Sequence, residues 1–213
     1  MLRIVSFTFN GFAENTYLLI DEATRATAIV DPGMYTRAEQ QKLTDFIAAE
    51  QLDVQYLLNT HAHIDHVLGN AFVLRQHAVP FLLHPLDLPA LRAVPTYAGP
   101  YGFAAYEPAE PTGELLPGQV VQLGESELEV RFAPGHAPGH VVLYDRVGGQ
   151  LVGGDVLFQG SIGRTDLPGG DYATLLESIR RELLTLPDAT VVYPGHGPAT
   201  TIGAERRGNP FLQ

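Results

Sequence analysis

Residues 60–66, THAHIDH, place three histidines and one aspartate on one short segment. His61 and His63 are two positions apart, so on extended backbone their side chains point to the same side. Asp65 and His66 follow where the chain is expected to turn into a helix. Neutral imidazole and carboxylate groups suit zinc, iron or manganese. The segment therefore predicts a metal site, and it can present ligands to two adjacent ions.

Further candidate ligands lie in glycine- or proline-containing turns that follow predicted strands. His136 and His140 belong to GHAPGH, Asp155 to VGGDVLF and His196 to PGHGP. Because strand ends on one edge of a sheet converge, these turns can direct their side chains at one point. A lone histidine is usually an ordinary core or turn residue, but the combination favours a metal centre. We expect His140 to hydrogen-bond a ligand or a carbonyl group rather than to bind metal.

The elements that must position these residues alternate between strands and helices. A capping box, Thr36-x-x-Glu39, opens one predicted helix, and Asp171 caps another. Residues 85–118 contain seven prolines and are expected to form a long, partly irregular insertion. The alternation predicts an α/β fold of two sheets with helices outside. Strands are expected at 15–21, 26–31, 55–60, 79–84, 120–123, 127–132, 141–145, 150–154 and 190–193, and a helix from 66 to about 77.

Composition limits the class of protein. The 213 residues suit one domain, and a formal charge of −11 argues against nucleic-acid or anionic-membrane partners. The chain has no cysteine, so a metal site must use His, Asp or Glu. The N-terminal segment lacks the apolar run of a signal peptide, and no stretch reaches the length of a membrane span. These features predict a cytoplasmic protein.

The motifs THAHIDH, APGHAPGH, GGDVLF and YPGHG, in this order, resemble the metallo-β-lactamase superfamily. Within it, the chain resembles the short glyoxalase II-like (hydroxyacylglutathione hydrolase-like) branch, which cleaves S-D-lactoylglutathione and related thioesters. The resemblance implies a four-layer αββα sandwich over residues 1–213, with the site at one edge of the two sheets. It implies two divalent metal ions, zinc foremost, with iron or manganese as alternatives. The implied ligands are His61, His63 and His136 for the first ion, Asp65, His66 and His196 for the second, and Asp155 as a bridge.

The resemblance also implies a mechanism in which two neighbouring ions activate a water that attacks the thioester carbonyl. Asp65 would hold or accept a proton of that water. Asp31, at the end of a predicted strand, resembles a conserved aspartate of the superfamily that braces the ligand loop without touching metal.

The substrate pocket departs from the pattern of full-length glyoxalase II. In GSIGRTD, Arg164 replaces a lysine and Asp166 stands where a tyrosine is usual. We expect Arg164 to bind a carboxylate of glutathione; the alternative is an ordinary surface ion pair with Asp166. Only a short segment follows His196, so we expect no helical C-terminal glutathione-binding domain and a more open site.

Two other functions remain as alternatives. GRTD also resembles the persulfide dioxygenases of the superfamily, which use one iron held by two histidines and one aspartate. A metal-stabilised module without catalytic activity is the third hypothesis. The expected partner is a small-molecule thioester, and the sequence leaves open whether the chain forms a homodimer.

Overall fold

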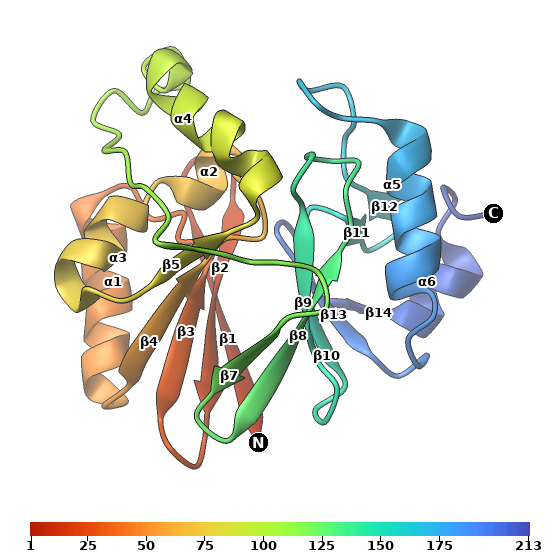
Figure 1. The fold of residues 1–213 in the computed structure, drawn as a ribbon, viewed down its shortest axis with the longest axis horizontal. Coiled ribbons are helices and arrows are strands. Elements are labelled where there is room, and N and C mark those ends of the chain that lie inside the picture. The colour runs from red at the N-terminus through yellow and green to blue at the C-terminus, as the bar shows by residue number, and fades with distance from the viewer.

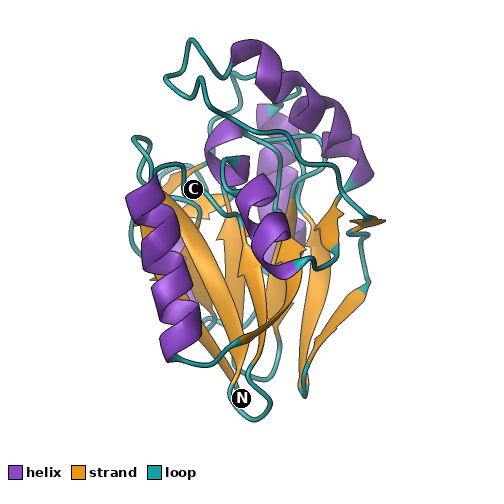
Figure 2. Cartoon of the chain, turned by 90° about the vertical axis from the view of Figure 1, so that its left-hand side faces the viewer, coloured by secondary structure: helices purple, strands orange, loops and turns teal.

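The computed structural model describes residues 1–213 and contains two six-stranded sheets that pack face to face. Figure 1 shows helices α1 to α4 outside the first sheet, and α5 and α6 outside the second. Figure 2, turned by 90°, shows the helices covering the strands of the first sheet. The four layers confirm the predicted α/β sandwich.

The first sheet has the order β1-β2-β3-β4-β5-β6, antiparallel from β1 to β3 and parallel from β3 to β6. The strands expected at 15–21 and 26–31 are present as β2 and β3, which form a hairpin. The strands are β1 (Leu2–Phe9), β2 (Glu14–Asp21), β3 (Ala26–Val30), β4 (Asp53–Leu58), β5 (Phe81–Leu83) and β6 (Gly113–Glu114). The helices are α1 (Arg37–Ala49), α2 (Ile64–Val67), α3 (Asn70–His77) and α4 (Leu88–Tyr97), the last preceded by a 3₁₀ turn at Pro85–Asp87.

The second sheet has the order β14-β13-β10-β9-β8-β7, and only the β10–β13 pair is parallel. Its strands are β7 (Val120–Leu123), β8 (Ser126–Phe132), β9 (Val141–Asp145), β10 (Gln150–Gly154), β13 (Val191–Pro194) and β14 (Thr200–Thr201). A small hairpin, β11 (Leu157–Phe158) and β12 (Ser161–Ile162), lies between β10 and α5 in the chain. Helix α5 (Tyr172–Ser178) continues as a π-helical turn (Ile179–Leu183), and α6 is Ile202–Gly208.

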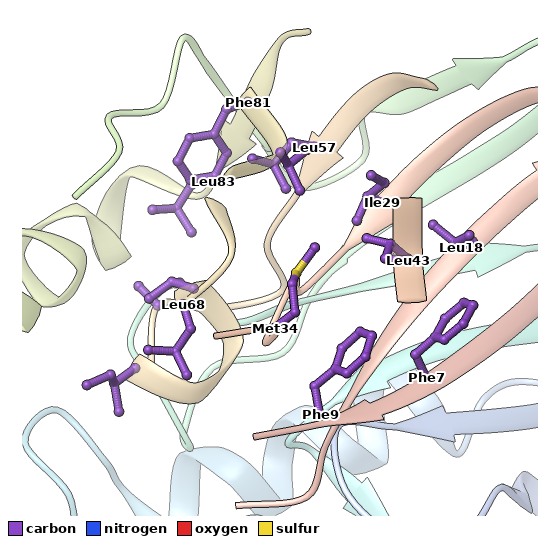
Figure 3. Close-up of a cluster of buried hydrophobic side chains, with 14 of the residues drawn as sticks. Phe7, Phe9, Leu18, Ile29, Met34, Leu43, Leu57, Leu68, Phe81 and Leu83 are labelled. Carbon is purple, nitrogen blue, oxygen red and sulfur yellow. The ribbon is translucent and has the colours of Figure 1, made fainter. Parts of the chain in front are cut away.

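Alternation along each buried strand supplies the apolar layers between the elements. In β2, Tyr17 and Leu19 pack against the second sheet, whereas Leu18 and Ile20 belong to the layer under the helices. Figure 3 shows part of that outer layer, in which Leu18 of β2 and Leu43 of α1 lie close together. Side chains of β2 therefore point into two different cores, which explains why the whole strand is buried.

The helix expected from 66 to about 77 is interrupted, so that prediction was wrong in detail. Gly69 separates α2 from α3, and its N–H donates to the carbonyl of Pro32 at 2.7 Å. A Cβ at Gly69 would lie 2.2 Å from Sδ of Met34 and 2.8 Å from that carbonyl oxygen. The helix is thus interrupted at Gly69 because the Pro32–Met34 turn packs directly against this residue.

The segment 85–118 is more regular than expected, because it contains the helix α4. Pro85 and Pro89 stand at the first positions of helical turns, where a missing N–H costs little. Pro95 lies inside the helix, but the burial of Leu91 and Val94 against the core favours helix nonetheless. Tertiary packing has therefore overridden the composition of the segment.

Five turns that follow strands β3, β4, β8, β10 and β13 meet at one edge of the sandwich. Hydrogen bonds join the sheets there, among them those from the Val141 N–H to the carbonyl of Thr60 at 2.9 Å and from the Tyr17 hydroxyl to that of Pro194 at 2.6 Å. This edge carries the candidate site. None of the helices combines the length and apolar character needed to cross a bilayer.

Candidate metal centre

All seven predicted ligands converge at this edge, in two neighbouring sets. In each set, ligand atoms from the three residues lie within 4.8 Å of one another. Asp155, from the turn after β10, stands between the sets. The first set is His61, His63 and His136, and the second is Asp65, His66 and His196.

The first set directs three imidazole rings at one point. Nδ1 of His63 lies 2.8 Å from Nε2 of His136. Nδ1 of His136 donates to the carbonyl oxygen of Arg164 at 2.7 Å, which keeps the lone pair of Nε2 on the inner side. Nδ1 of His61 lies 3.0 Å from the hydroxyl of Thr60. That hydroxyl donates its own hydrogen to Asp31, so it accepts from His61 and leaves Nε2 of His61 free to bind a cation.

The second set combines one carboxylate with two imidazoles. Nε2 of His196 lies 3.1 Å from Oδ2 of Asp65, while its Nδ1 donates to the carbonyl oxygen of Phe12 at 3.1 Å. Nε2 of His66 lies 3.6 Å from the same Asp65 oxygen. As in the first set, an outer hydrogen bond orients the ring and its inner nitrogen faces the other ligands.

The carboxylate oxygens of Asp155 approach nitrogen atoms of both sets. Its Oδ2 lies 3.5 Å from Nε2 of His136 and 3.5 Å from Nε2 of His196. Its Oδ1 lies 3.6 Å from Nε2 of His66. One carboxylate can therefore contribute an oxygen to each of two adjacent cations.

Asp31 braces the ligand loop, as expected. Its Oδ1 accepts the N–H of Thr60 at 2.7 Å, and its Oδ2 accepts the Thr60 hydroxyl at 2.6 Å and faces Nδ1 of His66 at 3.2 Å. Asp31, His61 and His66 are also close enough to be considered as a third ligand group. However, both oxygens of Asp31 are engaged by hydrogen-bond donors, so we assign it to support of His61 and His66.

Burial and neighbouring charges keep the first-set histidines neutral. Burial lowers the pKa of His61 well below its ordinary value, and burial together with His136 lowers the pKa of His63 to about 4. Burial likewise lowers the pKa of His136. Because a metal binds the unprotonated nitrogen, these rings are in the form required for coordination at neutral pH.

The carboxylates of Asp65 and Asp155 place negative charge around His66 in the second set. Burial opposes ionisation of Asp155, but His66 and the other histidines hold its pKa well below the usual range. Burial alone would lower the pKa of His66, yet Asp65 and Asp155 outweigh it and raise that pKa well above the ordinary value. A buried cluster of this kind requires a positive charge, which a proton on His66 or a metal ion can supply.

Unpartnered buried atoms show that the cluster fits a cation. Nε2 of His61, Nε2 of His66 and Oδ1 of Asp155 are buried without any hydrogen-bond partner. Each is an atom of a type that can bind a metal ion, and each faces the cluster described above. An uncompensated buried polar atom costs free energy, whereas cations bound to the two sets would satisfy all three.

The ligands differ in their exposure to solvent. His61 and His66 are completely buried, whereas His63, Asp65 and His196 are partly exposed. The exposed fractions of the Asp65 and His196 side chains are 14% and 28%. Solvent therefore reaches the centre at these three residues.

Arg164 is exposed, but its guanidinium is already engaged. Nε and Nη2 donate to the two oxygens of Asp166, each at 2.8 Å. Both side chains are largely exposed. The carbonyl group of Arg164 supports His136, so the residue contacts the first set through its backbone rather than its charge.

Two supporting residues were not predicted. Thr60 relays the contact between His61 and Asp31, and its position directly before the histidine segment was the available signal. Glu14 is fully buried at the start of β2, with Oε1 unpartnered and 4.0 Å from Nδ1 of His66. A carboxylate at the start of a buried, largely apolar strand was the only indication in the sequence.

Comparison with known proteins agrees with this geometry. A two-sheet sandwich with His- and Asp-rich turns at one edge defines a class of metal-binding α/β proteins. The sequence profile of the metallo-beta-lactamase superfamily matches residues 10–196. The chain therefore belongs to the metallo-β-lactamase superfamily.

Three similar proteins illustrate the range of the superfamily. The hydroxyacylglutathione hydrolase GloC of Haemophilus influenzae is 39% identical over 214 residues, covering 99% of this chain and 98% of its own. The structure of TTHA1623 in a di-iron-bound form superposes with a TM-score of 0.87 at 41% identity, covering 98% of this chain and 100% of that one. ETHE1 from Myxococcus xanthus superposes with a TM-score of 0.77 at 25% identity, covering 99% and 83%. Membership supports a metal-dependent enzyme.

Proposed function

We propose that the protein hydrolyses glutathione thioesters such as S-D-lactoylglutathione at a centre of two divalent metal ions. The observation that carries the proposal is the position of Asp155, whose oxygens lie within 3.6 Å of nitrogens from both ligand sets. The similarity to the hydrolase GloC supports the substrate class. Zinc is the first choice of metal, with iron or manganese as alternatives. The proposed ligands are His61, His63, His136, Asp65, His66, His196 and Asp155.

When bound, a pair of divalent ions lowers the pKa of water and polarises a carbonyl group. The protein itself supplies orientation and a place for the proton. Asp65 is the partly exposed carboxylate of the cluster, with Oδ2 held 3.1 Å from Nε2 of His196. We assign it to hold the attacking water and to accept its proton. The thiolate is a good leaving group, so little acid assistance is needed at sulfur.

Arg164 is proposed to contact the glutathione part of the substrate. Its guanidinium is exposed on a residue whose carbonyl group contacts His136, and a substrate carboxylate can take the place of Asp166 in the same bidentate arrangement. Because the substrate carboxylate would replace the Asp166 carboxylate at Arg164, the net gain in binding free energy is small. This contact is therefore expected to adjust substrate affinity and not to determine catalysis.

A persulfide dioxygenase with a single iron is the second candidate function. The similarity to ETHE1 and the GRTD segment at 163–166 favour it. Against it stands the complete second set, Asp65, His66 and His196, which a single iron would leave without a role. We therefore place the thioester hydrolase first.

Anaerobic thioester cleavage tests the choice. The zinc- or manganese-loaded protein is expected to hydrolyse S-D-lactoylglutathione without oxygen, and the iron-loaded protein to consume little oxygen when given glutathione persulfide. Rapid oxygen uptake with one iron per chain, and no thioester cleavage, would reverse the order. Metal binding without turnover of either substrate would instead favour the non-catalytic module.

A further inference from the structure

Asp87 is a buried carboxylate outside the ligand sets. It ends the 3₁₀ turn between β5 and α4 and is completely inaccessible to solvent. Its Oδ2 accepts the backbone N–H of Ala62 at 2.8 Å, and its Oδ1 accepts the backbone N–H of Gly139 at 2.6 Å. Each oxygen thus holds a different loop.

The two loops carry the first ligand set. Ala62 lies between His61 and His63, in the turn that follows β4 of the first sheet. Gly139 lies in the GHAPGH turn of the second sheet, which contains His136. One side chain therefore spans the gap between the sheets and links the backbone beside His61 and His63 to the backbone beside His136.

The packing at Gly139 shows how closely this link is fitted. A Cβ at Gly139 would lie 2.7 Å from the backbone nitrogen of Asp87 and 2.8 Å from its Oδ1. Only glycine allows the loop to approach the carboxylate at this distance. The hydrogen bond from Gly139 to Asp87 therefore depends on glycine at position 139.

The charge of Asp87 has no cationic partner, since its hydrogen-bond donors are the two backbone N–H groups alone. Burial raises the pKa of Asp87 to about 6, although the N–H groups of Gly139 and Ala62 oppose this shift. Burying a carboxylate without a cationic partner costs free energy, so the residue is not explained by core packing alone. The carboxylate instead forms charge-assisted hydrogen bonds to the backbone of both loops.

We propose that Asp87 is a positioning residue that fixes the separation between the His61–His63 pair and His136, and so shapes the first metal set. The inference rests on the proposed metal centre. A metal set requires its ligands to be held within a few tenths of an ångström, and supporting hydrogen bonds commonly change metal affinity by about 10- to 100-fold.

Asp87→Asn provides the main test, because an amide has one oxygen and must turn its NH₂ group toward the other N–H donor. The probe is Co²⁺ added to the metal-free full-length protein, with the visible absorption spectrum and chelator competition as readouts. We expect Asp87→Asn to weaken Co²⁺ binding by about 10-fold or more and to change the absorption bands.

Asp145→Asn is the matched control. Asp145 is also buried and also accepts two backbone N–H groups, from Val147 and Gly148 at 3.0 and 2.9 Å. It ends β9, just before the turn to β10, at the end of the sandwich away from the ligands. We expect this variant to lose thermal stability while keeping the wild-type Co²⁺ spectrum and affinity.

Gly139→Ala keeps the Asp87 carboxylate but forces it away from the GHAPGH loop. This variant is the test if Asp87→Asn does not fold. The same spectral change is expected. Wild-type spectra and affinity in the folded Asp87→Asn protein, or in Gly139→Ala when only that variant folds, would overturn the role of Asp87 alone. A wild-type protein that binds no Co²⁺ would instead overturn the metal centre itself.

Discussion

The backbone N–H of Asp155 donates a hydrogen bond of 3.0 Å to Nε2 of His140. His140 is completely buried, and its ring stacks on His61 with centroids 4.7 Å apart. Gly154, just before Asp155, has a φ of +48°, and a Cβ there would lie 2.6 Å from the His140 ring. Because Nε2 accepts this bond, the proton of the neutral ring is on the buried, unpartnered Nδ1, so neither nitrogen offers a free lone pair to a cation. We therefore assign His140 to support of the turn that carries Asp155.

His140→Ala and His136→Ala should therefore differ in metal content. We expect His140→Ala to retain both ions, while His136→Ala loses the first-set ion and, like Asp155→Ala, abolishes hydrolysis. Both His136 and Asp155 lie in turns, so loss of either side chain should leave the fold largely intact. The measurement is the number of ions per chain by elemental analysis, with circular dichroism as a check on folding. Equal metal loss in the two histidine variants would place His140 among the ligands.

The sequence was informative about the ligands because their signal is local. His61, His63, Asp65 and His66 lie on one short segment, and the remaining ligands sit in glycine- or proline-containing turns directly after apolar strands. Both features can be recognised without knowing the tertiary structure. The structure brings all seven residues to one edge of the sandwich, in the two sets that the family resemblance implied.

Asp87 could not be found in the same way. Its partners are the backbone N–H groups of Ala62 and Gly139, 25 and 52 positions away in sequence. Any residue except proline offers such a donor, so no pattern of side chains marks the contact. The ion pair between Arg164 and Asp166 could not be predicted with certainty either, because the sequence is compatible with both a free and a paired arginine.

Arg164→Ala should affect the binding of a charged substrate. We expect KM for S-D-lactoylglutathione to rise by no more than about fivefold, because exposed ion pairs contribute little in water. The rate constant kcat should change little, since the guanidinium lies outside the ligand cluster. A neutral aliphatic thioester serves as the comparison substrate and Asp166→Ala as the comparison variant, which frees the arginine. Equal effects of Arg164→Ala on both substrates would rule out a carboxylate contact.

Asp21 should contribute stability that depends on pH. It ends β2 and accepts hydrogen bonds from Ser126 at 2.6 Å and from the Thr24 N–H and hydroxyl at 2.9 and 2.7 Å. Burial opposes ionisation, but the Ser126 and Thr24 bonds hold the pKa of Asp21 at about 2. This is below the value of about 3.9 in an unfolded chain. As the pH falls, the unfolded state therefore binds the proton first, and the stabilisation is lost.

The free energy of unfolding of the wild type should thus exceed that of Asp21→Asn by about 1–2 kcal/mol above pH 5. The difference should shrink as the pH falls through 4 and disappear only below about pH 2. Urea titrations at a series of pH values measure it. Metal content should be the same in both proteins, because Asp21 lies at the opposite end of β2 from Glu14 and the ligands. A difference that does not vary with pH would show that the carboxylate charge is not responsible.

Gly33→Ala should disturb the second ligand set through steric contact alone. A Cβ at Gly33 would lie 1.9 Å from Oε2 of the buried Glu14 and 2.6 Å from the backbone oxygen of Asp65. The backbone cannot move without displacing Asp65, and Glu14 lies against His66. We expect a loss of about 1–3 kcal/mol in the free energy of unfolding, as is typical of overpacking, together with weaker binding of the second ion.

Gly11→Ala is the control for this prediction, because it makes the same substitution in the nearby β1–β2 turn, where a Cβ would meet nothing within 4 Å. It should leave both stability and metal content close to the wild type. Urea unfolding of the metal-free proteins separates the steric cost from the effect of the ion, and titration with Zn²⁺ then measures the second site. If the two alanine variants behave alike, Gly33 is not the point at which packing fixes Asp65, and the second set must owe its geometry to the hydrogen bonds of His66 and His196.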